Sequence, residues 1–116
     1  MSGNDARTVV ATTAAALGMI PHPTKPISDI ATLDGVAPAT ASAVAAAAAP
    51  HLYPFFDELV AAQVPRLGKV AWTLGYYAKY AASLRERTKR LSGDWTPAAV
   101  ERALWASSGG KVALQR

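Results

Sequence analysis

The sequence contains no cysteine. This absence excludes a disulfide scaffold, a thiolate zinc site, a CxxC redox centre and a cysteine nucleophile. The two histidines, His22 and His51, are isolated from other metal-ligating residues, and no serine sits in a nucleophile-elbow sequence. We therefore expect no metal and no cofactor.

Large apolar side chains are also scarce. Hydrophobic residues make up 51% of the 116 residues, but 26 of these are alanine. A chain of this length buries roughly two-thirds of the surface that its unfolded state exposes, which is enough for one domain. We expect a single domain over residues 1–116 in which helices pack closely through alanine.

The sequence has no long apolar run without interruption. The longest charge-free stretch, residues 35–56, contains three prolines and several polar residues, which is unlike a membrane span. Asp5 precedes only a weakly apolar stretch, so the N-terminus does not resemble a secretory signal. These features predict no membrane partner and an intracellular protein, in the nucleus if the source is eukaryotic and in the cytoplasm otherwise.

Charge is distributed unevenly along the chain. Residues 1–50 carry two basic and three acidic side chains, whereas residues 51–116 carry ten basic and five acidic ones. A basic excess of this kind is typical of proteins that bind nucleic acid or an anionic membrane, although it also serves solubility.

Abundant alanine, the lack of alternating β-branched runs and well-placed proline and glycine predict an all-α chain of five or six helices. In the first helix, Val9, Val10, Thr13 and Leu17 form an apolar stripe, and Gly18 ends the helix. Residues 1–4 and 107–116 are expected to be flexible. The predicted helices span about residues 5–17, 26–34, 38–49, 54–64, 76–91 and 97–106.

Residues 26–60 are predicted to form a short helix, a glycine turn and an alanine-rich helix, followed by an acidic residue at the start of the next helix. This order, with LDGVAPATA over residues 33–41, resembles the helix-hairpin-helix segment of the base-excision DNA glycosylase superfamily, endonuclease III type. It is similar in particular to largely uncharacterised, chiefly fungal glycosylase-like proteins. The shared motifs, in order, are GVAPATAS, PFFDE, YYAKYAASLRERTKRL and VERALW. The resemblance covers about residues 5–108 and corresponds to the hairpin half only.

The resemblance implies that residues 26–49 form a helix-hairpin-helix that binds the phosphate backbone of duplex DNA. Glycine suits such a turn because it accepts a positive φ and has no side chain that would block a phosphate. Ala37 stands where the family has its second glycine, so a positive φ there would strain the backbone. The residues implied to bind phosphate are Gly35, Val36, Ala37, Ala39 and Thr40.

Asp57 falls at the position of the superfamily's catalytic aspartate, which supports an oxocarbenium-like sugar. Ala39 replaces the lysine nucleophile of the lyase-type members, so the resemblance implies no β-lyase activity. An acid at Asp57 is also favoured simply by the dipole of a helix that starts near Pro54. The lobe that would hold a flipped base has no counterpart in this sequence, so we expect no catalysis by the chain alone.

A basic patch is predicted on the longest helix, in the segment LRERTKR. Basic side chains can follow a DNA backbone. The alternative is the solvated face of an amphipathic helix, since Glu86 lies among them. The predicted patch consists of Arg85, Arg87, Lys89 and Arg90.

The leading hypothesis is a helix-hairpin-helix module that binds duplex DNA without sequence preference. One alternative is a monofunctional DNA glycosylase without lyase activity, which uses Asp57 and a partner protein or missing lobe to complete its cleft. The other is a helical protein-interaction domain in which residues 39–49 pack against a partner. In that case Ala45→Glu is expected to break the assembly.

Overall fold

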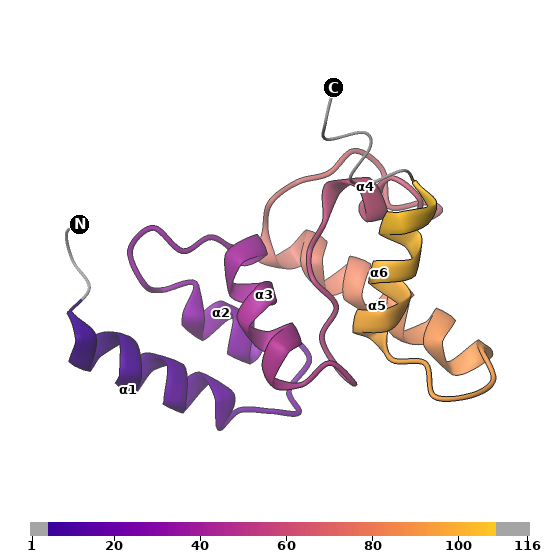
Figure 1. Cartoon of the computed structure of the whole chain (residues 1–116). Helices are drawn as coiled ribbons and strands as arrows, with labels where there is room; N and C mark the ends of the chain where they lie inside the picture. The colour runs from indigo at the N-terminus through magenta and orange to yellow at the C-terminus, as the bar shows by residue number, and fades with distance from the viewer. Residues whose placement is uncertain (1–4, 109–116) are drawn as a thin grey trace.

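Six α-helices form the regular structure of this chain in the computed structural model, which describes residues 5–108 (Figure 1). No strand occurs among these residues, so the prediction of an all-α fold with five or six helices is confirmed. The expected flexibility of residues 1–4 and 109–116 falls outside the described part, whereas Ser107 belongs to the last helix. The helices are α1 (Ala6–Leu17), α2 (Lys25–Ile30), α3 (Pro38–Ala48), α4 (Glu58–Ala61), α5 (Leu74–Arg90) and α6 (Pro97–Ser107).

Side-chain caps fix where three of the longer helices begin. Asp5 caps α1, because its carboxylate accepts the N–H of Thr8 at 2.7 Å. Thr73 and Thr96 cap α5 and α6 in the same way, each accepting an N–H from three residues ahead. Such caps satisfy N–H groups that have no partner inside the helix. Because of its cap, α5 begins before the predicted Tyr76.

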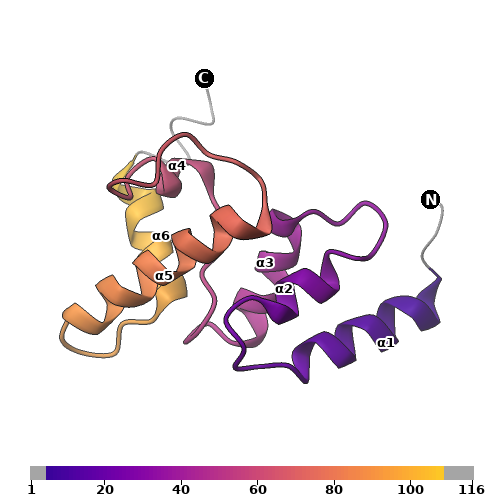
Figure 2. The ribbon, with the colours of Figure 1, turned by 180° about the vertical axis from the view of Figure 1, so that it is seen from behind.

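A connecting segment, residues 50–57, joins two groups of helices. Figures 1 and 2 show α1, α2 and α3 on one side of it and α4, α5 and α6 on the other. α1 packs on α2, α2 packs on α3, and α6 contacts both α4 and α5. Phe56 of the connecting segment lies at the centre of the core, since it is almost fully buried. Its ring lies 4.9 to 5.8 Å, between centroids, from the rings of Trp72, Tyr76, Tyr77 and Tyr80.

The helix that we predicted from Pro54 begins later, because side chains of other helices hold the connecting segment. The hydroxyl of Ser42 in α3 accepts the N–H of Phe56 at 2.8 Å. Tyr77 in α5 donates to the carbonyl of Pro54 at 3.0 Å, and Tyr80 donates to the next carbonyl. Buried backbone groups outside a helix or sheet need such partners because they cannot reach water. The prediction of a helix start at Pro54 is therefore wrong.

Alanine supplies the close helix contacts that the composition predicts. Ala41 and Ala45 of α3 are fully buried. In the apolar stripe predicted on α1, Val9 and Val10 are exposed and Thr13 and Leu17 are half-buried. The buried residue of this helix is Ala16, which lies on the same face as Val9, seven residues before it. The small side chain of Ala16 lets α1 approach α2 closely.

Candidate functional site

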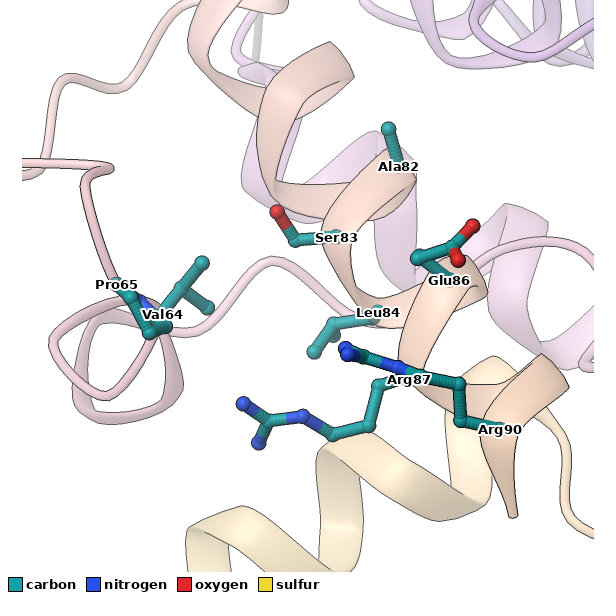
Figure 3. Close-up of a pocket in the computed structure, with 8 residues that line it drawn as sticks. All are labelled: Val64, Pro65, Ala82, Ser83, Leu84, Glu86, Arg87 and Arg90. Carbon is teal, nitrogen blue, oxygen red and sulfur yellow. The ribbon is translucent and has the colours of Figure 1, made fainter.

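The predicted basic patch does not form one surface. Successive residues of an α-helix are rotated by about 100°, so Arg87 and Arg90 lie on one flank of α5 and Arg85 and Lys89 on the other. Arg87 and Arg90 line a hollow of about 330 Å³ together with Val64; Figure 3 draws these side chains. The four residues are therefore divided into two pairs.

Arg85 is bound to the chain's own backbone. Its Nε donates to the carbonyl of Leu52 at 2.7 Å, and a terminal nitrogen donates to the carbonyl of Pro23 at 3.1 Å. The guanidinium also lies 5.6 Å from the ring centroid of Tyr53, a cation–π distance. Arg85 therefore ties the connecting segment to α5 and has fewer donors left for a DNA phosphate.

A glycine turn joins two packed helices in the segment predicted as a hairpin. α2 and α3 pack on each other, and residues 31–37 connect them. Gly35 in this turn is exposed and has a φ of +78°. No heavy atom of another part of the chain lies within 4 Å of the place that a Cβ would take. The turn therefore requires glycine for its backbone, and the space beside it is open.

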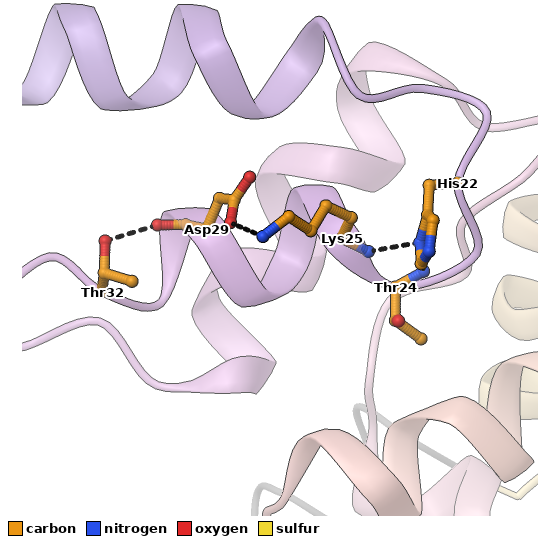
Figure 4. A network of polar contacts seen from close by, with 5 residues as sticks. All are labelled: His22, Thr24, Lys25, Asp29 and Thr32. Carbon is orange, nitrogen blue, oxygen red and sulfur yellow. Dashed lines mark hydrogen bonds and ion pairs between the residues drawn. The ribbon is translucent and has the colours of Figure 1, made fainter.

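A network of polar contacts holds α2, the first helix of the hairpin (Figure 4). Nδ1 of His22 accepts the N–H of Lys25 at 2.9 Å and that of Thr24 at 3.2 Å. The ammonium of Lys25 lies 3.1 Å from the carboxylate of Asp29, and Thr32 donates its hydroxyl to the carbonyl of Asp29. These contacts stabilise both ends of a helix that is too short to be stable alone.

The first turn of α3 presents backbone N–H groups that no side chain caps. Within residues 5–108, the N–H groups of Ala39 and Thr40 have no hydrogen-bond acceptor. Ala37 has a φ of −94°, so the strain expected from a positive φ does not arise. The N–H of Val36, in contrast, donates to a carbonyl of the turn itself at 3.1 Å. Within the described residues, Val36 is thus the one of the five predicted residues whose N–H already has an acceptor.

The hairpin and the basic residues lie in different places. In Figures 1 and 2 the turn between α2 and α3 and the C-terminal end of α5 lie on opposite sides of the molecule. That end of α5 carries Arg87, Lys89 and Arg90. The structure therefore does not bring the predicted phosphate-binding residues and the predicted basic patch together.

Asp57 caps α4. Its Oδ1 accepts the N–H of Leu59 at 2.7 Å and that of Val60 at 3.2 Å. Its backbone has extended dihedral angles rather than helical ones, so Asp57 precedes the helix instead of lying in its first turn. An N-cap carboxylate stabilises a helix through these bonds and through the helix dipole.

Asp57 also lines a cleft of about 350 Å³ between the connecting segment and α6. Glu101 of α6 lies in this cleft and is only 6% exposed. Burial, followed by the negative charge of Asp57, raises the pKa of Glu101 to about 7, although Arg102 opposes the change. Phe55, Arg102 and Trp105 complete the lining. The cleft thus holds two carboxyl groups and two aromatic rings.

Sequence reasoning missed Glu101. In α6 this residue lies four positions before Trp105 and next to the buried Val100, so helical spacing already placed it near the inner face. The sequence therefore contained one signal for this residue, namely a carboxyl group on the predicted inner face of a helix. The partner group, Asp57, comes from a distant part of the chain.

The buried face of α3 belongs to this chain's own core. Ala41, Ala45 and Ala49 are all at most 2% exposed. Glutamate at position 45 would therefore place a charge in the core, so Ala45→Glu tests folding rather than contact with a partner.

No family model, no curated protein and no solved structure matches this chain. Among residues 5–108, no helix combines the length and the apolar character needed to cross a membrane. Function is therefore inferred from the hairpin and the cleft themselves.

Proposed function

We propose that this chain is a DNA-binding module whose hairpin, formed by α2 and α3, binds one phosphate of a duplex without sequence preference. The observation that carries this proposal is the exposed turn at Gly35, where the backbone is open and a φ of +78° requires glycine. The uncapped first turn of α3 lies directly after it.

The chemistry of this turn suits an anion. Backbone N–H groups at a helix start carry partial positive charge, and a phosphate oxygen supplies the acceptors that they lack. Ala39 and Thr40 offer such groups, and the formal net charge of +4 favours approach to DNA. Contacts of this kind position a protein on the backbone and read no base.

The proposal needs no catalysis. Asp57, the residue on which the glycosylase hypothesis depends, has a structural role as the cap of α4. Glycosylase activity is the second candidate function, because Asp57 lines a cleft of about 350 Å³.

Fluorescence anisotropy with a labelled duplex tests the proposal. We expect affinity to fall steeply between 50 and 200 mM salt, because binding releases counterions from the phosphates. Gly35→Asp should weaken binding about tenfold or more on every duplex, since it adds strain and a negative charge beside the phosphate.

Gly68→Asp is the matched control. Gly68 has a φ of +79° and equally open surroundings, so the same substitution causes the same strain and charge change outside the hairpin. Equal loss in both variants, or affinity that does not respond to salt, would contradict the proposal. Preference of the wild type for a duplex with an abasic analogue would favour the glycosylase hypothesis.

A further inference from the structure

Glu101 is a buried acid that has no polar partner in the part of the chain that the structure describes. Its side chain is only 6% exposed, and among residues 5–108 it forms no hydrogen bond and no ion pair. Burial of a carboxylate without compensating bonds costs free energy, so such a group is rare unless it has a use. In this part of the chain, every fully enclosed side-chain oxygen or nitrogen has a hydrogen-bond partner. Because the Glu101 carboxylate has no such partner, its oxygens are not fully enclosed, and they are accessible from the cleft.

The groups around Glu101 do not neutralise it. Asp57, before α4, adds a second negative charge, and Arg102 of α6 is exposed and makes no ion pair with either carboxylate. Within residues 5–108, Tyr80 of α5 is the other ionisable group that interacts with Glu101, and its hydroxyl donates to the carbonyl of Phe55. Oδ2 of Asp57 is also left for a ligand, since both cap hydrogen bonds go to Oδ1.

The cleft is apolar as well as acidic. Phe55 and Trp105 line it with Asp57, Glu101 and Arg102, and its volume is about 350 Å³. Aromatic faces attract planar organic cations, and paired carboxylate oxygens accept hydrogen bonds from two N–H groups at once. In the described part of the chain no third acid, histidine or cysteine joins the two carboxylates, which favours an organic cation over a metal ion.

We infer that the cleft between the connecting segment and α6 binds a planar amidinium or guanidinium group attached to an apolar body. The carboxylates of Glu101 and Asp57 accept its N–H groups, and Phe55 and Trp105 pack against its plane. Such a group comes either from a small molecule or from an arginine side chain of a peptide. The site is independent of the hairpin and of DNA binding.

Isothermal titration calorimetry on the full chain tests this site with two probes. Benzamidine represents the small molecule, and N-acetylarginine amide represents the peptide side chain. Benzamide has the shape of benzamidine without its charge, so we expect it not to bind. At pH 8, Glu101→Gln should weaken binding of the cationic probe about tenfold or more, because it removes a charged acceptor.

Two further variants separate a binding role from a structural one. Asp57→Asn removes the charge and keeps a good helix cap, so it should weaken binding while α4 stays folded. Glu58→Gln removes a neighbouring acid that is exposed and does not line the cleft, so it should leave binding unchanged.

The pH dependence gives an independent measurement on the wild type. With a pKa of about 7, the ionised fraction of Glu101 falls about tenfold between pH 8 and pH 6. Affinity for the cation should fall by the same factor, and Glu101→Gln should lose this dependence. Binding of only one probe identifies the source of the cation. If the folded protein binds neither probe, or binds with unchanged affinity after Glu101→Gln, the inference is overturned.

Discussion

Gly35 and Glu101 are the two residues whose local chemistry points most directly to a ligand. Gly35 requires a left-handed backbone and has open space beside it, which are properties of one residue and its neighbours in sequence. Glu101 is unusual only because of what surrounds it, namely the buried cleft and the charge of Asp57. The first could be predicted from a sequence motif. For the second, helical spacing indicates an inward-facing carboxyl group but not its meeting with Asp57.

Glu101 should make stability depend on pH. Its pKa is about 7 in the folded chain, above the ordinary value of 4.5. The folded state therefore binds this proton more tightly than the unfolded state does. The resulting contribution to the free energy of unfolding is fully present below pH 4.5 and is lost as the pH rises through 7. The full difference is of the order of 3 kcal/mol. We expect Glu101→Gln to be more stable than the wild type at pH 8, and most of this gain to disappear at pH 5.

Urea unfolding of both proteins at the two pH values measures this effect. Glu58→Gln serves as the control, because Glu58 is exposed. A gain in stability from Glu101→Gln that is equal at pH 5 and pH 8 would show that Glu101 is not the titrating group.

At the scale of the element, the connecting segment shows how tertiary contacts can override a local signal. Proline at position 54 is a good first residue for a helix, and the sequence favours a helix from there. In the structure α4 begins only after Asp57, because hydroxyl groups from α3 and α5 bind the backbone of residues 54–56. The starts of α1, α3 and α6 were predictable because their caps and prolines act within one turn.

Ser42 provides a test of this account. It is fully buried in α3 and accepts the N–H of Phe56. We expect Ser42→Ala to destabilise the protein by about 1 to 3 kcal/mol, although alanine is the better helix former, because a buried N–H loses its acceptor. Chemical unfolding measures the change in the free energy of unfolding.

Ser83→Ala is the matched control on α5. Ser83 is only half-buried, and no hydrogen bond of its hydroxyl is seen within residues 5–108. Its replacement should leave stability unchanged or slightly higher. An equal effect at both positions would mean that Ser42 does not hold the connecting segment.

At the scale of the whole molecule, stability should not be uniform. α1 buries Ala16 alone, whereas α5 buries Tyr77, Tyr80, Ala81 and Leu84. Helices with few buried contacts open locally at a low free-energy cost. After correction for intrinsic rates, amides in the middle of α1 should exchange with deuterium at least about tenfold faster than those in the middle of α5. Equal protection in a residue-resolved exchange experiment would show that α1 opens only with the whole domain.

The sequence by itself determined the all-α class, the positions of most helices and the glycine turn, because these depend on signals that act over a few residues. Helix caps, proline and the positive φ of Gly35 are signals of this kind. Only the tertiary structure decided how much of the α1 stripe is buried, which carbonyls Arg85 binds and where Glu101 meets Asp57. These outcomes depend on segments that are distant in the chain and become neighbours through packing, and no local pattern encodes which of them meet.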